Sequence, residues 1–415
     1  MSFCIYESDI IICNNEQIVM YNIENGTEIT ISLPKLQSDK KVDVHNNINK
    51  ETPHTITNVM FSYDGKYFFV YTNRKQLCLY ERKSQNLVLN KILPRAASKV
   101  QFTPNNDIVV ADKTGDAYIY SNKQSDNGVL LLGHLSMLLD VLITEDEKYI
   151  ITTDRDEKIR VSMFPNSYNI VSYCLGHTKF VTNILELPHD KNVLISCGGD
   201  GMFILWDYKI GKELLCINFR NKISKSDIEK FNEQLHNCNL EEFVEVLPVK
   251  HLKLLALNTT SSLAIISFYN NTLLLVYIIN STSKSNFDVV YVQSIIADSE
   301  PIECYLYKNN LWILNELGFK IYEFKNNNFI LTDGTDYKIN NLNNYWKALK
   351  KDFTQQNLFS ILYKRKYDNV QEYLQRKKTI ETIHLIQQFH QSSLNFSVGT
   401  CTFRKSASTC IRIDN

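Results

Sequence analysis

The 415-residue sequence has little glycine and proline and no net charge. With 13 glycines and 8 prolines, it is neither collagen-like nor broadly low in complexity. Its 45 Lys and Arg residues balance 45 Asp and Glu residues, which argues against a protein that coats nucleic acid along its length. Neutral net charge does not exclude a local basic patch. No apolar run reaches the roughly 18 residues of a membrane-spanning helix, and the longest candidate, 273–279, has the length of a strand.

The ten cysteines lack the spacing of a metal or redox motif. The nearest neighbours, Cys4/Cys13 and Cys401/Cys410, are nine positions apart, and no Cys-x-x-Cys pair occurs. Zinc ribbons and thioredoxin-like motifs therefore have no support. The first residues show neither the basic region nor the long apolar region of a secretory signal. We expect a soluble intracellular protein whose cysteines are reduced core residues.

What the sequence does contain is a repeat of about 40 residues. Four segments consist of a polar turn and then alternating apolar residues, the pattern of a half-buried strand. Aligned on what we take as the last strand of each unit, positions 80, 121, 162 and 206 are 41, 41 and 44 residues apart. Gly133-His134 and Gly176-His177 repeat with a spacing of 43. Four short strands per unit, with Gly-His early and Trp-Asp late, are typical of a WD-repeat β-propeller.

The repeat also predicts how the units assemble. A four-stranded blade cannot bury both faces alone, whereas radial stacking buries them and ring closure removes most exposed edges. Weaker units around positions 21, 277 and 322 bring the count to seven. We predict an all-β fold, a seven-bladed WD-repeat β-propeller with a short helical C-terminal element. The expected parts are a propeller at 1–335 with an interblade insertion at 220–245, a basic helical element at 341–384 and a disordered tail at 385–415.

Two histidines and one tryptophan are expected to be structural. The imidazole of each Gly-His pair can bond the Asp of the tight turn in its own blade, which predicts the pairs His134/Asp156 and His177/Asp200. Trp206 is expected to pack between blades. The alternative, that the histidines are metal ligands or general bases, is less favoured. The one glycine cluster, 198–201, is interpreted as turn chemistry.

Three runs of sequence resemble one particular WD-repeat family. Residues 133–141, 149–162 and 174–181 are similar to the non-catalytic subunit of the tRNA (guanine-N7-)-methyltransferase, the wuho-type family. WD repeats in general share Gly-His and Trp-Asp, but they do not share the run Asp-Arg-Asp-Glu-Lys-Ile-Arg-Val-Ser at 154–162. The resemblance is strong over 92–216 and patchy elsewhere.

The resemblance implies a scaffold. The catalytic partner would hold S-adenosylmethionine and methylate N7 of the guanine at position 46 of tRNA. This chain would bind and stabilise that partner as a heterodimer and help position the tRNA, in the nucleus with the cytoplasm as a second location. The residues agree that this chain is not the enzyme, because they contain no glycine-rich strand-to-helix turn and no hydrolase or P-loop motif. We expect no catalytic residue, metal or cofactor on it.

Charged residues around one turn form the candidate partner site. Asp156 is expected to have a structural role, and its apolar neighbours are expected to point inward. The charged side chains that remain on or beside this turn are Arg155, Glu157, Lys158 and Arg160. They either contact a partner or simply form a solvated turn. The resemblance favours basic groups that pair with acidic groups on the catalytic subunit, since Arg can grip a carboxylate with both nitrogens. Glu157 would orient Arg160 or meet a lysine of the partner. Phe180 is either an aromatic anchor or a core residue. The predicted partner-binding residues are Arg155, Glu157, Lys158, Arg160, Lys179 and Phe180.

The C-terminal region is the candidate tRNA contact. Residues 341–384 contain nine Lys and Arg residues against four Asp and Glu residues. Such a segment can neutralise phosphates and add salt-dependent affinity without reading the base sequence. A nuclear localisation signal, or favourable charge at the end of a helix, is the competing interpretation. The predicted phosphate-contacting residues are Lys347, Lys350, Lys351, Lys364, Arg365 and Lys366.

One other class of function fits the same fold. A WD-repeat adaptor for a ubiquitin ligase or a chromatin complex would need the same exposed loops but no tRNA. An enzyme active as the isolated chain is the least favoured reading. The identity of the proteins that co-purify with the chain separates scaffold from adaptor.

Overall fold

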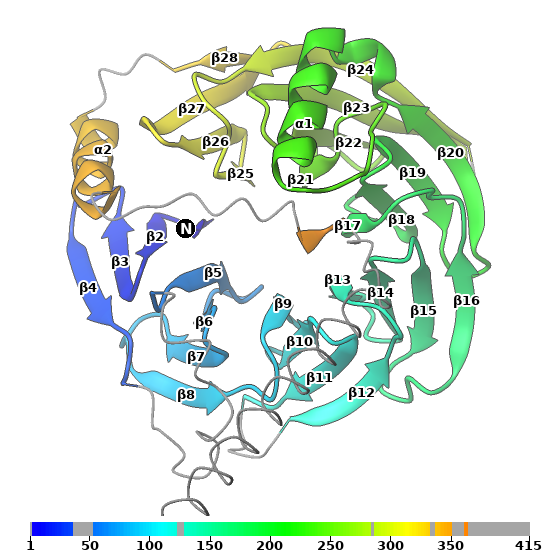
Figure 1. Ribbon diagram of the computed structural model, residues 1–415. Coiled ribbons are helices and arrows are strands. Elements are labelled where there is room, and N and C mark those ends of the chain that lie inside the picture. The colour runs from blue at the N-terminus through cyan, green and yellow to red at the C-terminus, as the bar shows by residue number, and fades with distance from the viewer. Residues whose placement is uncertain are drawn as a thin grey trace, which may run out of the picture. The chain divides into compact units, whose positions relative to one another are not determined.

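The computed structural model describes residues 2–35, 53–122, 128–283, 286–332, 337–350 and 361–363. Seven antiparallel sheets of four strands each stand around a ring, which confirms the predicted seven-bladed propeller (Figure 1). Every blade is built from four strands that are consecutive in the chain. Within the described residues, no helix is both long enough and apolar enough to cross a membrane.

The strands follow the repeat in chain order. Blades 1 and 2 contain β1 (Ser2–Tyr6), β2 (Asp9–Asn14), β3 (Gln17–Asn22), β4 (Glu28–Ser32), β5 (Ile56–Phe61), β6 (Tyr67–Thr72), β7 (Gln76–Glu81) and β8 (Leu87–Ile92). Blades 3 and 4 contain β9 (Ala97–Phe102), β10 (Ile108–Asp112), β11 (Asp116–Tyr120), β12 (Val129–Gly133), β13 (Leu138–Ile143), β14 (Tyr149–Asp154), β15 (Ile159–Met163) and β16 (Ile170–Cys174).

The later blades have longer strands and carry the helices. Blades 5 and 6 contain β17 (Val181–Leu187), β18 (Asp190–Gly198), β19 (Met202–Asp207), β20 (Lys212–Asn218), β21 (Val249–Ala256), β22 (Ser261–Phe268), β23 (Leu273–Ser283) and β24 (Asn286–Ile296). Blade 7 contains β25 (Glu303–Tyr307), β26 (Asn310–Asn315), β27 (Gly318–Lys325) and β28 (Asn328–Leu331). The 3-10 helix η2 (Arg220–Lys222) and α1 (Lys225–Asn237) connect blades 5 and 6, within the expected insertion, and α2 (Tyr337–Leu349) follows blade 7.

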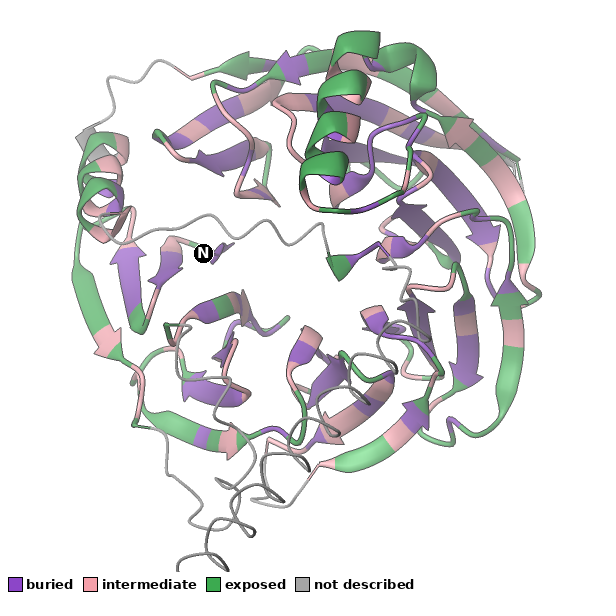
Figure 2. Ribbon diagram, viewed as in Figure 1, coloured by how far each residue is buried: buried purple, intermediate pink, exposed green. Residues whose placement is uncertain are grey.

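The strand used to align the repeat is the third of each blade. We expected it to be the last, and the structure corrects this, because an outer strand follows it in every blade. In blade 2 the second and third strands, β6 and β7, are buried almost throughout, whereas outer strands such as β8 and β12 are largely exposed (Figure 2). An exposed outer strand lacks the strict alternation that marks a half-buried strand, so its sequence signal is weak.

Among the described strands, none is exchanged between the two ends of the ring. Blade 1 comes entirely from the beginning of the chain and blade 7 from residues 303–331, and β1 packs against β25. The seam between them is filled by aromatic side chains: Phe3 packs edge-on against Phe319 at 5.1 Å, and Phe319 against Trp346 of α2 at 6.4 Å. Trp346 is completely buried in this cluster.

Polar contacts of α2 join the two blades at the same seam. The Asn343 side chain accepts a hydrogen bond from the Phe319 backbone at 2.7 Å, and Lys350 donates to the Glu316 carbonyl at 2.8 Å, both in blade 7. On the other side, the amide of Asn14 in blade 1 donates to the carbonyl of Leu349. The first part of the expected C-terminal element is therefore packed into the propeller, and its predicted end at 384 lies outside the described residues.

Candidate partner-facing surface

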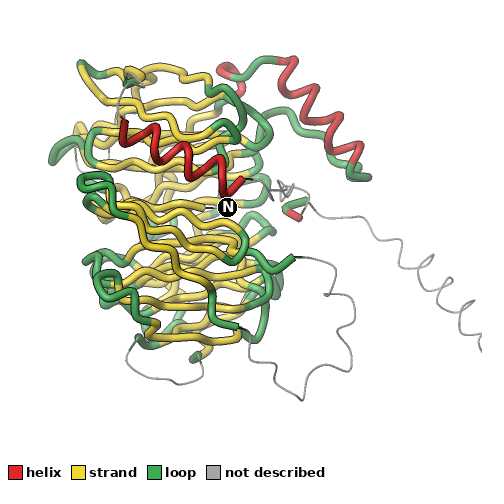
Figure 3. The backbone as a smooth tube through the Cα atoms, turned by 90° about the vertical axis from the view of Figure 1, so that its left-hand side faces the viewer, coloured by secondary structure: helices red, strands yellow, loops and turns green. Residues whose placement is uncertain are grey.

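The predicted partner residues lie on one side of the ring. In each antiparallel blade, the turn between the second and third strands and the connection to the next blade emerge on the same side, here called the loop face. The β14–β15 turn carries Arg155, Glu157 and Lys158, and the β16–β17 connection carries Lys179 and Phe180. α1 belongs to the β20–β21 connection and extends from this face beyond the strand ends (Figure 3).

The β14–β15 turn is organised by Asp154, the last residue of β14. His134 contacts Asp154 through Nδ1 at 2.9 Å and Thr152 through Nε2 at 2.9 Å. The other oxygen of Asp154 accepts from the backbone nitrogens of Asp156 at 2.9 Å and Lys158 at 3.1 Å. The predicted pair His134/Asp156 is therefore not formed. Asp156 instead accepts from the Ser136 hydroxyl at 2.9 Å.

Blade 5 explains why the two turns differ. Its predicted pair is present, with His177 Nδ1 2.9 Å from Asp200, and His177 Nε2 lies 2.7 Å from the Ser196 hydroxyl. The buried indole of Trp206 donates to the same hydroxyl at 2.8 Å. Blade 5 has Gly198 at the strand end where blade 4 has Asp154, as the pairings Val181↔Gly198 and Leu138↔Asp154 show. In blade 5 the carboxylate that bonds the histidine therefore comes from the turn, as Asp200.

The tip of the β14–β15 turn presents a small mixed surface. Glu157 and Lys158 are exposed, and Glu157 has a left-handed backbone with φ of 73°. Arg155 is half-buried; its backbone nitrogen donates to Met137 at 3.0 Å, and its Nε is buried with no hydrogen-bond partner among the described residues. Leu135, fully exposed, lies between His134 and Ser136, which both bond to this turn. Sequence reasoning missed Leu135, although a leucine in a polar connection was the available signal.

Arg160 ties two blades together. Its guanidinium donates to the Ser162 hydroxyl at 2.9 Å, to the Gly133 carbonyl at 3.2 Å and to the Ser167 carbonyl at 3.1 Å. Gly133 ends β12 in blade 3, whereas Ser162 and Ser167 belong to blade 4. Arg160 therefore bonds within the chain. A role toward a partner would be indirect, through the position in which Arg160 holds the neighbouring strands of blades 3 and 4.

Lys179 and Phe180 are also engaged within the chain. Lys179 pairs with Glu242 at 2.9 Å. Phe180 is buried and packs edge-to-face against Tyr363 at a ring distance of 5.2 Å, in the cluster that fills blades 5 and 6. Burial raises the pKa of Tyr363 well above that of a free phenol. The structure therefore places Phe180 in the core, the alternative left open by the sequence.

The predicted phosphate-contacting residues are only partly within the described chain. Lys347 is exposed on α2, and Lys350 is half-buried at the Glu316 carbonyl. The remaining four lie outside the described residues: Lys351, Lys364, Arg365 and Lys366. Their role toward tRNA stays a prediction.

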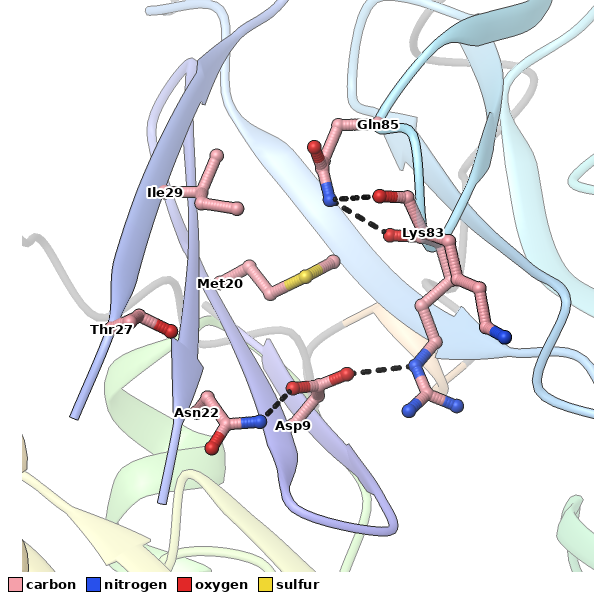
Figure 4. Close-up of a pocket in the computed structure, with 8 residues that line it drawn as sticks. Asp9, Met20, Asn22, Thr27, Ile29, Lys83 and Gln85 are labelled. Carbon is pink, nitrogen blue, oxygen red and sulfur yellow. Dashed lines mark hydrogen bonds and ion pairs between the residues drawn. The ribbon is translucent and has the colours of Figure 1, made fainter. Parts of the chain in front are cut away.

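A cavity of about 180 Å³ lies between blades 1 and 2 on the side opposite the loop face (Figure 4). Its ionic groups satisfy one another, since Asp9 accepts from Asn22 at 2.7 Å and from Arg82 at 2.8 Å. Arg82 also pairs with Glu7 at 2.7 Å and lies over the ring of Tyr6. This arrangement joins two blades and compensates the charges of Asp9 and Arg82 within the fold. Among the described residues, no cluster of His, Cys, Asp and Glu is arranged to hold a metal.

Comparisons with known proteins agree on one family. A family model described as the tRNA methyltransferase TRM82 WD40 domain matches residues 120–310. The chain is 31% identical over 334 residues to the tRNA (guanine-N(7)-)-methyltransferase non-catalytic subunit wdr4 of Danio rerio, covering 76% of this chain and 75% of that protein. It is 32% identical over 344 residues to the non-catalytic subunit wuho of Drosophila pseudoobscura pseudoobscura, covering 78% and 77%.

Other matches are shorter or concern the fold alone. The subunit WDR4 of Mus musculus is 43% identical over 158 residues, and the chain spans only 38% of the length of that relative. Among solved structures, a chain of the mitotic checkpoint complex superposes with a TM-score of 0.55 at 13% identity, covering 74% of this chain and 83% of that chain, which supports a propeller fold and nothing more specific. The two relatives matched over 75% and 77% of their length carry the assignment: the chain belongs to the WDR4/wuho family of non-catalytic subunits of tRNA (guanine-N(7)-)-methyltransferase.

Proposed function

We propose that this chain is the scaffold subunit of a tRNA guanine-N7 methyltransferase and supports N7-methylguanosine formation at position 46 of tRNA. Relatives that match most of the chain carry the name of the non-catalytic subunit. A non-catalytic subunit needs a catalytic partner, which in this proposal holds S-adenosylmethionine and forms a heterodimer with this chain. We further propose that the complex acts in the nucleus.

The partner contact is assigned to the β14–β15 turn of blade 4. Lys158 offers an exposed cation and Leu135 an exposed apolar side chain beside it. Both are presented by a backbone that His134, Ser136 and Asp154 hold in place, so little ordering entropy opposes binding. This fixed pairing of charge and apolar surface is the single observation that carries the assignment. An acidic, partly apolar patch on the catalytic subunit would complement it.

The assignment of tRNA contacts rests on fewer residues. Two of the predicted phosphate-contacting residues lie in the described part of the chain, and the exposed one, Lys347, lies on α2 at the seam between blades 7 and 1. A lysine at that place would add salt-dependent affinity for tRNA held by the heterodimer. The expected contribution of one such contact is modest.

Co-purification tests the proposed contact directly. With both subunits expressed together, Lys158→Glu should reduce recovery of the catalytic subunit about tenfold, because a cation becomes a like charge against acidic groups. The matched control is Lys83→Glu, an exposed lysine on the opposite side of the ring, which should leave recovery unchanged. Full recovery with Lys158→Glu would remove this surface from the proposal. Recovery of a ubiquitin ligase or chromatin complex without any methyltransferase would favour the adaptor function instead.

A further inference from the structure

The connection between blades 5 and 6 concentrates negative charge in a chain that is neutral as a whole. Residues 225–245 contain six acidic residues and two basic ones. This stretch comprises α1 and the segment that returns to β21. It also extends beyond the strand ends on the loop face, where a partner can reach it (Figure 3).

α1 has two distinct faces. Phe231 and Leu235, one turn apart, are buried in the cluster that fills blades 5 and 6. The outward face and the returning segment border an open hollow of about 520 Å³ on the surface. Its lining combines carboxylates, amides, an imidazole and one aromatic ring, from Glu229, Asn232, Glu233, His236, Asn237 and Phe243.

Phe243 is displayed by a fixed backbone. Its side chain is 71% exposed, whereas the neighbouring Val244 is buried. Asn232 of α1 holds the segment through two hydrogen bonds with the backbone of Val244, accepting at 2.8 Å and donating at 3.0 Å. An aromatic ring exposed on a fixed segment is typical of a binding surface, because the cost of ordering it is already met within the fold.

Four of the six acidic residues of this connection form two pairs with different roles. Glu242 pairs with Lys179 of the β16–β17 connection at 2.9 Å, and Glu245 pairs with Arg220 at the start of its own β20–β21 connection at 2.8 Å, so both carboxylates are engaged within the fold. Glu229 and Glu233 lie one helical turn apart and line the hollow, and no ion pair of either is found within the described part of the chain. Two carboxylates beside an exposed ring complement a cationic group with an apolar stem.

We propose that the hollow between α1 and Phe243 binds an arginine- or lysine-rich segment of a partner protein. The cation would lie over the ring of Phe243, its methylene stem would cover the remaining apolar surface, and Glu229 and Glu233 would accept its hydrogen bonds. The negative charge of the hollow disfavours a nucleic acid at this place. This surface is separate from the β14–β15 turn, and the inference does not depend on the proposed function.

Fluorescence anisotropy with a short labelled peptide of alternating arginine and glycine tests the inference on the full chain. The peptide should bind, and Phe243→Ala and the double variant Glu229→Gln/Glu233→Gln should each weaken binding about tenfold. Matched controls should bind like the unaltered chain: Leu317→Ala removes an apolar side chain that is 63% exposed, and Glu24→Gln/Asp288→Asn removes two exposed charges elsewhere. Thermal unfolding of each variant verifies that the propeller remains folded.

Three outcomes would overturn the inference. The first is equal peptide affinity in the hollow variants and the control variants. The second is absence of binding by the unaltered chain, and the third is binding of a glutamate-glycine peptide or a single-stranded RNA in the hollow with the same sensitivity to Phe243→Ala.

Discussion

Blade 5 and the seam between blades 7 and 1 are stabilised by different interactions, hydrogen bonds in the first and apolar packing in the second. In blade 5, His177, Ser196, Asp200 and Trp206 form one hydrogen-bonded network within about 30 positions of sequence. At the seam, Trp346 and other aromatic residues pack together from opposite ends of the propeller. A buried polar network specifies its own blade once every member is paired, whereas the seam depends on apolar area that only the closed ring can bury.

The difference separates local from global stability. A blade with a complete network can lose one hydrogen bond and keep its strands, because neighbouring blades still cover both faces. Loss of the apolar seam exposes one face of each of the two blades at once, since no exchanged strand of the described chain links them. We therefore expect the largest effects at the seam.

The largest expected effect comes from Trp346→Ala. Removing a fully buried indole should lower the free energy of unfolding by about 3–5 kcal/mol, through lost burial and the cavity that remains. Urea denaturation measures the change. Lys347→Ala, the exposed neighbour on α2, is the control and should change stability by less than about 0.5 kcal/mol. A loss below about 1 kcal/mol for Trp346→Ala would mean that the seam does not limit stability.

The second effect concerns charges on the inner strands of blades 6 and 7. Burial alone would raise the pKa of Glu303, but Lys253 at 3.0 Å and His251 outweigh it and lower that pKa to about 2. Burial lowers the pKa of His251 to about 3. Both groups bind fewer protons in the folded state than in the unfolded state, so the free energy of unfolding should fall as the pH drops. The fall should begin below about pH 6.5, where the unfolded His251 takes up its proton. The contribution of Glu303 should be lost between about pH 4.5 and about pH 2.

Denaturation as a function of pH measures this contribution, which is up to about 3 kcal/mol for Glu303. Glu303→Gln should flatten the acid side of the stability profile, whereas Glu24→Gln, at an exposed turn, should leave its shape unchanged. An acid limb of unchanged slope in Glu303→Gln would show that other carboxylates govern acid unfolding.

A smaller effect distinguishes the two aspartates of blade 4. Asp154→Ala removes the partner of His134 and the acceptor for two backbone nitrogens, and it should cost about 2 kcal/mol. Asp156→Ala removes the acceptor of the Ser136 hydroxyl at a half-buried position and should cost about 1 kcal/mol or less. Thermal or urea unfolding of the two variants decides between them. The reverse order would restore the pairing predicted from the sequence.

The smallest effect comes from Arg160→Ala. Of its three hydrogen bonds, the one to Gly133 reaches blade 3 and the other two lie within blade 4, at a partly exposed place, so their loss should cost about 1 kcal/mol. Arg160→Lys keeps the charge but cannot reproduce the planar set of donors, and it should lose a similar amount. Measuring both stability and recovery of the catalytic subunit separates positioning from charge. Unchanged stability together with reduced recovery in Arg160→Ala would point to a direct partner contact.

Much of the fold could be predicted because the repeat is local. Alternating apolar residues, the Gly-His pairs and Trp206-Asp207 lie within single blades, so their spacing indicated seven units before any contact was known. The aligned strand was mistaken for the last of its blade because the outer strand that follows it is exposed and needs no strict alternation of apolar residues. The partner of His134 escaped because the choice between Asp154 and Asp156 depends on where β14 ends, which the sequence pattern does not define.

The parts that could not be predicted depend on distant contacts. Asn14 and Leu349 are 335 positions apart, and Tyr363 covers Phe180 from the far end of the described chain. No periodicity in the sequence connects such residues. The same holds for Arg160 and Lys179, whose charge suggested a partner contact but whose side chains bond within the propeller.

The most direct test is the N7-methylguanosine content of tRNA at position 46 in cells that lack this chain. The scaffold account predicts that the modification is lost, that the unaltered chain restores it, and that Lys158→Glu restores it poorly while the Lys83→Glu control restores it fully. Modification at normal levels in cells without the chain would contradict the account.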